Sequence, residues 1–302
     1  MKNLNAFCAL ALCFFLAGNY QGHAQSKDQT FDARNLVGGR SYVFTLRNGD
    51  DITAVLDSAD LSYIHISDNI YGPRRVLLSA VRAAKEIELT AAGFYPNPDA
   101  GRYFYGPTAI LNQKGDRYFY TNGALAALSY APSKYVTTSL GTVWFLNVFG
   151  VPNVNPSIKV GLEISPNLHV ATGGTMIFGY SDWLEEGFAF ALPFVNATLG
   201  GTENNVTLGL GLAGSNLGSF QGFEWAQTPT VTMGFSRRIS ERYMIVSENY
   251  LISADGGRLG IVSGFLRRLN TRNAWDYGFG GFILEGLPFP IWLPLASYAL
   301  RF

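Results

Sequence analysis

The few histidines and cysteines limit the chemistry that this sequence could perform. Both cysteines, Cys8 and Cys13, lie in an apolar run close to the N-terminus. If that run is removed as a leader, no thiolate nucleophile and no disulfide remain. The two histidines of the remaining chain, His65 and His169, are far apart in the sequence, which excludes the usual zinc clusters rich in nitrogen and sulfur. We predict no metal and no cofactor, although a site made of carboxylates alone stays open.

A hydrolytic site would need a hydroxyl nucleophile with a histidine base within reach. His169 is the candidate base, but it stands beside Asn167 in an expected turn, where a solvated histidine is the commoner case. The run Gly209-x-Gly211-x-x-Gly214 matches a dinucleotide fingerprint, yet a loop follows it instead of a helix. We therefore assign no catalytic residue and predict that the protein is not an enzyme.

The strands that must position any functional residue can be inferred from the alternation of apolar and polar residues. From residue 102 onward, stretches such as IKVGLEIS (158–165) and VTLGLGLA (206–213) alternate aliphatic with polar or glycine residues. Such alternation predicts strands with one apolar face. About eleven segments of this kind can be counted, and 102–111 would be a twelfth. Because bacterial single-chain barrels prefer even numbers, we expect twelve strands, or ten if one segment is misassigned.

The apolar face of these strands is expected to face lipid. Charged residues make up 15% of the chain, against about 25% in an ordinary soluble domain. After residue 24, no run reaches the roughly 18 apolar residues that a membrane helix needs. The fold class predicted for 102–302 is an all-β transmembrane antiparallel β-barrel. Aromatic residues near strand ends should form its belts at the membrane interfaces: Trp144, Trp275, Tyr277, Trp292 and Tyr298.

Charged residues within the predicted strands should point into the lumen, because an arginine or lysine facing lipid at the midplane costs about 2–4 kcal/mol. The candidates for lining the lumen are Lys159, Glu163, Glu248, Arg258, Asp276 and Arg301. They either pair across strands and brace the wall, or they select solutes. The glycine-rich inner face favours an open channel over a filled one. The stretch 102–111, if it is not a strand, would lie in the lumen as a plug.

The chain before the barrel contains three further regions. A lysine, a short apolar run and small residues at 22 and 24 predict a signal peptide over 1–24. The region 37–90 holds four or five short alternating segments, and Asn48-Gly49 between the first two is a strong hairpin signal. A linker rich in proline and glycine follows at 91–101.

Two stretches carry family resemblances. YVFTLRNGDDITAVL, a turn and RRVLLSAVRAAKEI resemble the small SH3/Sm-like domain of Bacteroidota envelope proteins, in which Val81, Ala84 and Ile87 would close the sheet. NPDAGRYFYGPTAILNQKGDRYFY (97–120) resembles the first segment of a group of uncharacterised Bacteroidota outer-membrane β-barrels. This resemblance implies an envelope location and a barrel, and it brings no activity and no catalytic residue.

Residues and resemblance together predict an outer-membrane protein with 37–90 in the periplasm. Phe302, by resemblance to other outer-membrane proteins, would be the assembly signal read by the barrel-insertion machinery. Outer-membrane lipid and a periplasmic partner of the small domain are the other expected partners. A net charge of zero without a basic stripe argues against nucleic acid. The first hypothesis is a passive or selective channel for small solutes. The alternatives are a structural or adhesion protein with a plugged barrel, and a lipid-modifying enzyme with His169 as base.

Overall fold

The computed structural model describes residues 33–68, 71–87, 89–90, 93–181, 186–217, 223–254, 257–270, 272–285 and 289–302. The predicted signal peptide lies outside these residues. The chain divides into two compact units, Met1–Ile87 and Glu88–Phe302. No helix among the described residues has the length and apolarity needed to span a bilayer.

The first unit contains a five-stranded antiparallel sheet in the order β4-β3-β2-β1-β5. Its strands are β1 (Ser41–Leu46), β2 (Asp51–Ala59), β3 (Tyr63–Asp68), β4 (Gly72–Leu77) and β5 (Val81–Ile87), with a 3-10 turn, η2 (Leu78–Ala80), before β5. The predicted hairpin at Asn48-Gly49 is confirmed, because Gly49 has a φ of 93° and joins β1 to β2. Phe44, Ile64 and Ile66 are fully buried at the centre of the sheet.

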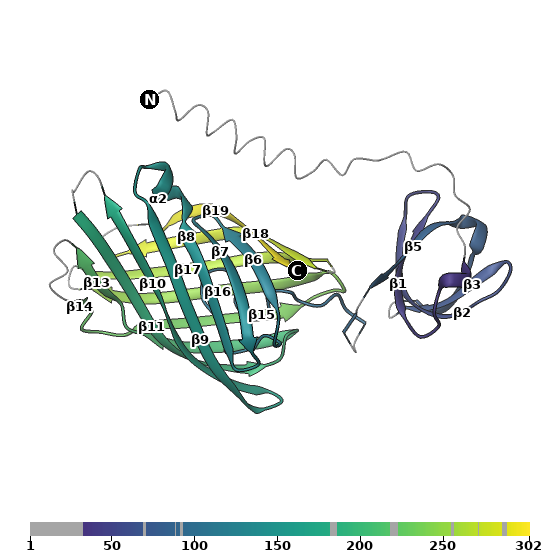
Figure 1. Ribbon diagram of the computed structural model, residues 1–302, viewed down its shortest axis with the longest axis horizontal. Coiled ribbons are helices and arrows are strands. Elements are labelled where there is room, and N and C mark those ends of the chain that lie inside the picture. Colours follow the sequence, from purple (N-terminus) through teal and green to yellow (C-terminus); the bar gives the residue numbers. More distant parts are fainter. Residues whose placement is uncertain are drawn as a thin grey trace, which may run out of the picture. The chain divides into compact units, whose positions relative to one another are not determined.

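The second unit is a closed antiparallel barrel (Figure 1). Within the described residues, twelve strands form the ring, and pairing between β10 and β11 closes it. Its strands are β6 (Arg117–Asn122), β7 (Leu125–Ser133), β8 (Val136–Val143), β9 (Asn153–Ser165), β10 (Leu168–Ser181), β11 (Glu186–Gly200), β12 (Asn204–Gly211), β15 (Thr230–Arg238), β16 (Tyr243–Ala254), β17 (Gly257–Leu269), β18 (Asn273–Leu284) and β19 (Ile291–Arg301). A short hairpin of β13 (Gly214–Leu217) and β14 (Glu224–Trp225) is attached to β11.

The barrel has the expected twelve strands, but they are not the twelve segments expected from the sequence. The stretch 102–111 forms no strand, and the barrel begins at Arg117. The residues 117–133 instead supply two strands, as the hairpin of β6 and β7. Its turn is fixed by Asn122, whose side-chain oxygen accepts a hydrogen bond from the backbone N–H of Leu125 at 3.0 Å. Trp144 ends no strand but begins the short helix α2 (Trp144–Val148).

The two faces of the barrel differ as the alternation predicts. On β12, Leu208 and Leu210 are 59% and 55% exposed on the outer face. Thr207, on the inner face of the same strand, is 3% exposed. On β18, Phe279 is 61% exposed while Asp276 on the inner face is buried. An outer face of this kind is that of a transmembrane barrel. The protein is therefore all-β, with a transmembrane barrel and a separate five-stranded sheet.

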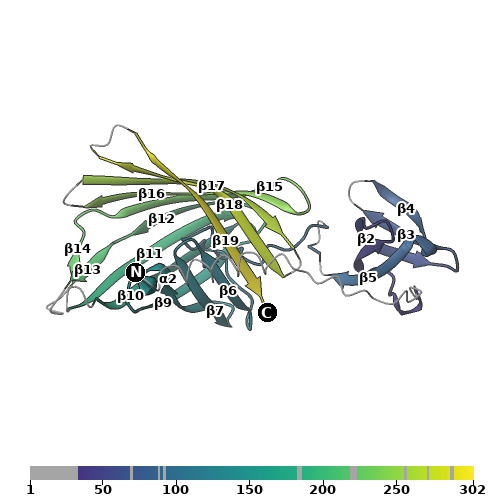
Figure 2. The ribbon, with the colours of Figure 1, turned by 90° about the horizontal axis from the view of Figure 1, so that it is seen from above.

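The two ends of the barrel differ in their connections. At one end, which we call the short-turn end, turns of two to four residues join the strands: 134–135, 166–167, 201–203, 239–242 and 270–272. At the other, the long-loop end, connections reach eighteen residues and include α2, β13 and β14. β19 runs from the long-loop end to the short-turn end, where the C-terminus lies (Figure 1). Figure 2 shows the same two ends from a second direction.

Candidate functional site: a segment inside the lumen

Residues 97–116, which we call the lumen segment, run into the barrel from the short-turn end and return to it. On the way in, the Tyr95 N–H donates to the carbonyl of Glu241, in a turn of the short-turn end, at 3.2 Å. On the way out, Asp116 pairs with Arg301 at 2.8 Å. Between these points the segment reaches Glu248, the sixth of the twelve residues of β16. The segment therefore occupies the half of the lumen next to the short-turn end.

The deepest part of the lumen segment is a tight turn. The Tyr103 N–H donates to the Gly106 carbonyl and the Thr108 N–H to the Gly101 carbonyl, each at 3.0 Å. A Cβ on Gly106 would lie 2.5 Å from both the Glu248 carboxylate and the Tyr250 hydroxyl. A side chain at this position would require the ends of Glu248 and Tyr250 to move away from the turn.

Glu248 binds the tip of this turn through its backbone. Its Oε2 accepts the N–H groups of Phe104 at 2.9 Å and Tyr105 at 2.7 Å, and its Oε1 accepts the N–H of Gly106. The hydroxyl of Tyr250 donates to the same carboxylate. Glu248 is only 3% exposed, so these donors compensate for the loss of water around the charge.

Lys159, on the wall strand β9, binds the two limbs of the lumen segment. Its Nζ donates to the carbonyls of Gly101 at 3.0 Å, Thr108 at 3.2 Å and Ile110 at 2.7 Å. These three bonds use all three N–H donors of the ammonium group. A buried cation thus satisfies carbonyls that no strand or helix would otherwise pair.

Arg267 and Asp276 form a buried ion pair between β17 and β18. The guanidinium donates to the two carboxylate oxygens at 2.7 and 2.9 Å, and the side chains are 1% and 2% exposed. Arg267 also donates to the carbonyls of Asp99 at 3.2 Å and Tyr103 at 2.8 Å. The pair therefore both braces the wall and holds the entering limb.

Neutral side chains of the wall complete the attachment. Asn122 donates to the Phe104 carbonyl at 2.9 Å, and Asn196 to the Pro107 carbonyl at 2.7 Å. Thr198 accepts the N–H of Ala109 at 2.7 Å. Sequence reasoning missed these residues because an inward asparagine or threonine looks like any polar lumen position. The signal that could have found them is amide or hydroxyl side chains at inward positions of neighbouring strands.

The inner glycines make room for the lumen segment. A Cβ on Gly234 of β15 would lie 2.3 Å from the ring of Tyr103. The Tyr103 hydroxyl in turn donates to Asn205 at 2.7 Å and lies 2.8 Å from the Thr207 hydroxyl. The ring of Phe104 stacks on that of Phe265, with centroids 4.2 Å apart. A glycine-rich inner wall, expected to mark an open pore, here accommodates a filling segment instead.

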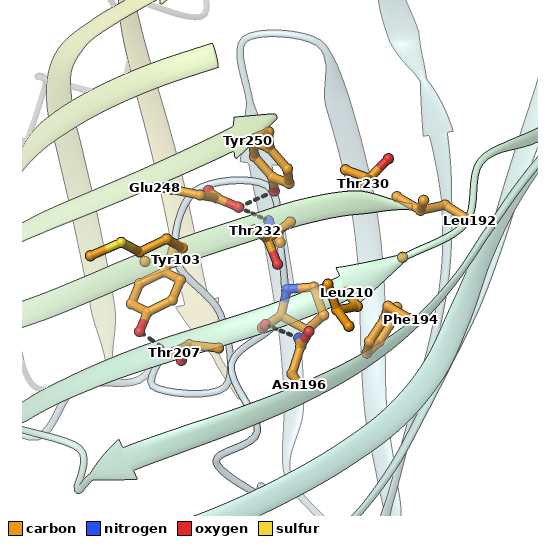
Figure 3. Close-up of a pocket in the computed structure, with 15 residues that line it drawn as sticks. Tyr103, Leu192, Phe194, Asn196, Thr207, Leu210, Thr230, Thr232, Glu248 and Tyr250 are labelled. Atoms are coloured by element: carbon orange, nitrogen blue, oxygen red, sulfur yellow. Dashed lines mark hydrogen bonds between the residues drawn. The ribbon is translucent and has the colours of Figure 1, made fainter. Parts of the chain in front are cut away.

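The space left at the tip is small. A cavity of about 50 Å³ lies between the lumen segment and the wall, lined by Tyr103, Gly106 and inward residues of β11, β12, β15 and β16. In Figure 3, Glu248 and Tyr250 lie on one side of it and Asn196 and Phe194 on another. Small-molecule sites are usually about 300–1,000 Å³, so this cavity is too small to hold a ligand of that kind.

The six charges predicted to line the lumen lie in two settings. Lys159, Glu248 and Asp276 are buried in the lumen, and Arg301 is partly exposed at the short-turn end with Asp116. Glu163 and Arg258 do not join them. Glu163 is exposed near the short-turn end of β9, and Arg258 is exposed near the long-loop end of β17. Both stand at strand ends, beyond the reach of the lumen segment.

The five predicted interface aromatics lie toward both ends of the barrel. Trp144 in α2 and Trp292 at the start of β19 are at the long-loop end, 37% and 56% exposed. Trp275 and Tyr298 are paired in register nearer the short-turn end, with ring centroids 4.5 Å apart, and Tyr277 follows at 51% exposed. Their role as membrane-interface belts stays a prediction.

His169 lies in β10 and not in a turn, and it is 9% exposed. Its Nδ1 has no hydrogen-bond partner within the described residues. The residue opposite it in β11 is Thr198, whose hydroxyl is engaged with Ala109 and Thr207. The described part of the chain therefore brings no activated hydroxyl to this imidazole.

Comparison with known proteins finds no matching family model and no matching curated protein. Among solved structures, the KdgM porin is 10% identical, with a TM-score of 0.40 over 62% of this chain and 98% of that one. OmpT of Vibrio cholerae is 8% identical, with a TM-score of 0.37 over 87% and 95%. The CymD monoaromatic hydrocarbon channel is 7% identical, with a TM-score of 0.38 over 88% and 89%. At these values the similarities carry no conclusion about this chain.

Proposed function

We propose that the protein is an outer-membrane channel for small solutes whose lumen segment is a gate. The observation that carries this proposal is the way in which Lys159 and Glu248 hold the segment, by three carbonyls and three N–H groups respectively. Both charges belong to the wall and both are satisfied by the segment. When the segment leaves, the same two charges become lining residues of the opened lumen.

The nature of these contacts supports release over permanent closure. Hydrogen bonds between protein groups are exchanged for hydrogen bonds to water when a segment moves out, so each contributes only about 0.5–1.5 kcal/mol net, or about 1.5–3 kcal/mol when a charged group takes part. The contacts that hold the segment are therefore ones that water can replace, and a driving force that exceeds their sum can release it. The stack of Phe104 on Phe265 is the main apolar contact that must also be broken.

The direction of the barrel in the membrane follows from its ends. In outer-membrane barrels the short turns face the periplasm and the longer loops face outward. By that rule the lumen segment enters from the periplasm, and the unit that precedes it in the chain is periplasmic. We also propose that this unit is SH3/Sm-like, since β5 returns beside β1 and buries Val81 and Ile87 as the resemblance requires. Its partner would be periplasmic, and the C-terminal strand would be read by the insertion machinery.

The second candidate is a structural protein whose barrel stays plugged. One observation favours it: the lumen segment leaves a space of only about 50 Å³ at its tip. The two candidates differ in whether the segment leaves under any condition, and a reversible tether tests that difference.

The test is a disulfide between the lumen segment and the wall. Residues 25–302 contain no cysteine, so Ala109→Cys with Thr198→Cys gives a single pair at a site where the Ala109 N–H meets the Thr198 hydroxyl at 2.7 Å. In a planar bilayer we expect ion conductance with the pair reduced and silence with it oxidised. The Thr198→Cys variant alone, treated with the same oxidant, is the control.

Two results would overturn the gate. Equal, steady conductance in the reduced and oxidised states would show that ions pass without movement of the segment. Silence in both states, with heat-modifiable migration showing a folded barrel, would leave the plugged structural protein as the function.

A further inference from the structure

The wall of the barrel holds the lumen segment chiefly through the main chain of the segment. Within the described residues, six wall side chains form hydrogen bonds with its backbone groups between Asp99 and Ile110: Asn122, Lys159, Asn196, Thr198, Glu248 and Arg267. A backbone carbonyl and N–H are present at almost every residue of any polypeptide. These contacts therefore recognise a peptide chain without requiring a particular sequence.

Lys159 and Glu248 are complementary to the two polar groups of a peptide unit. The ammonium can only donate, and it meets three carbonyls, whereas the ionised carboxylate can only accept, and it meets three N–H groups. Among the described strands of the ring, four lie between β9 and β16 one way round and six the other way. A chain in the lumen thus meets a donor on one wall and an acceptor on the wall nearly opposite.

The lumen segment occupies the width of two peptide chains. It enters and returns through the short-turn end, and the Lys159 ammonium donates to Gly101 on one limb and to Thr108 and Ile110 on the other. The Thr108 N–H also donates to the Gly101 carbonyl at 3.0 Å, so the limbs are adjacent. Departure of both limbs would leave room for a single extended peptide beside the same wall groups.

Other small solutes match this lining less well. An ion of one sign would meet both a cation and an anion on the wall. A hydrocarbon would leave the buried charges without partners, which is costly. A saccharide presents hydroxyl groups that donate and accept alike, so it gains nothing from the separation of the donor on β9 from the acceptor on β16.

We propose that the solute of the opened channel is a short peptide, bound through its main chain by Lys159, Glu248 and the neighbouring amide and hydroxyl side chains in place of the lumen segment. The inference deepens the proposed channel function by naming its solute class, and it rests on that function for the release of the segment. The segment then acts as a built-in competitor of the solute. Because it belongs to the same chain, it competes at an effective concentration in the millimolar range, so a peptide must be present at about 10 mM to displace it.

The test measures displacement of the lumen segment by a peptide added to the detergent-solubilised chain, residues 25–302. Thr108→Cys places the one thiol of this chain on the segment, at a position that is 1% exposed, and modification by a water-soluble methanethiosulfonate measures its exposure. Tetra-alanine is the probe. If it binds the wall in place of the segment, mass action at about four times its dissociation constant should raise the modification rate about fivefold.

Tetrasarcosine is the matched control. It is an isomer of tetra-alanine with the same charged ends, but its methyl groups are on nitrogen, so it has no amide N–H for Glu248 to accept. We expect it to leave the rate within about twofold. Glu163→Cys, exposed near the short-turn end, should react at the same rate with either peptide. Equal acceleration of Thr108→Cys by tetrasarcosine or by maltotriose, or no acceleration by tetra-alanine, would overturn the proposal.

Trypsin gives a second measure that needs no substitution, since Arg102 and Lys114 lie on the lumen segment. Tetra-alanine should speed cleavage after these residues, and tetrasarcosine should not. Cleavage at the same rate with both isomers would overturn the proposal.

The tethered pair of the preceding section separates the two proposals. Conductance that depends on the tether, with no difference between the isomers, would leave the gated channel and remove its peptide solute. A difference between the isomers in a barrel that never conducts would leave a wall that binds peptides and remove the channel.

Discussion

Lys159 and Glu248 bind the same segment through opposite halves of its peptide groups. The ammonium on β9 accepts no hydrogen bond and meets only carbonyls, while the carboxylate on β16 meets N–H groups. Irregular backbone is tolerated at membrane depth only where protein groups satisfy it. The two charges therefore do for the lumen segment what a strand ladder does for the wall, and the predictions below follow from that role.

Replacing Glu248 with glutamine should release the tip of the lumen segment. The amide keeps an acceptor but turns a donor toward backbone N–H groups, and it loses the charge. Since a hydrogen bond to a charged group contributes about 1.5–3 kcal/mol, a loss of about 2 kcal/mol would raise the equilibrium constant for release about thirtyfold. Planar-bilayer recording should show a higher open probability than wild type. Glu163→Gln, at an exposed position, should match wild type, and the same rise in that variant would contradict the prediction.

Lys159→Met should act in the same direction, and its effect should multiply with that of Glu248→Gln. The two side chains contact different groups of one segment, so their losses add in free energy and multiply in the equilibrium constant for release. Planar-bilayer recording of the double variant should show a higher open probability than either single variant, while the barrel still shows heat-modifiable migration. A double variant no more open than Lys159→Met alone would show that the two charges do not hold the segment independently.

Gly106→Ala should displace the turn because its Cβ would lie 2.5 Å from Glu248 and Tyr250. We expect faster protease cleavage within 97–116 and increased conductance, with the barrel itself intact. Gly264→Ala is the matched control, since a Cβ there meets nothing within 4 Å. Unchanged proteolysis in Gly106→Ala would show that the wall yields and the segment stays.

Asp276→Asn should destabilise the barrel as well as the lumen segment. It leaves Arg267, 1% exposed, without its carboxylate, and removing one partner of a buried ion pair costs about 3–5 kcal/mol. The temperature at which the folded band converts to the unfolded band in a gel assay should fall. Arg258→Gln, at an exposed strand end, should leave that temperature unchanged, and equal stability of Asp276→Asn would contradict the structural role of the pair.

The barrel could be predicted from the sequence because alternation repeats along each strand. Leu208, Leu210 and Phe279 face outward as their spacing requires. The hairpin of β6 and β7 could have been predicted as well, because Asn122-Gly123 is the same hairpin signal as Asn48-Gly49 between β1 and β2. Lys159, Glu248 and Asp276 could be predicted to face inward from the cost of a charge in lipid.

The periodicity of the sequence could not predict that the lumen segment contacts these charged residues. The stretch 102–111 was open to two interpretations, a strand or a plug, and the structure supports the second. The pattern of 102–111 could not distinguish a strand from a plug, because the backbone of the lumen segment is satisfied by residues up to 168 positions away in the sequence, as with Asp99 and Arg267.

Both limbs of the lumen segment leave the barrel through the same end, and this fixes how tension on the chain would act. Force on the residues before Tyr95 reaches only the entering limb, so it loads the bonds of Tyr95 to Glu241 and Arg238 first. The bonds to Arg267 follow, then the tip at Glu248 and, last, the returning limb at Ala109. Bonds loaded one after another peel apart under far less force than bonds loaded together. A pull on the first unit would therefore break the contacts of the segment one after another, beginning with the entering limb. An equal push from the long-loop end would load all of its contacts at once.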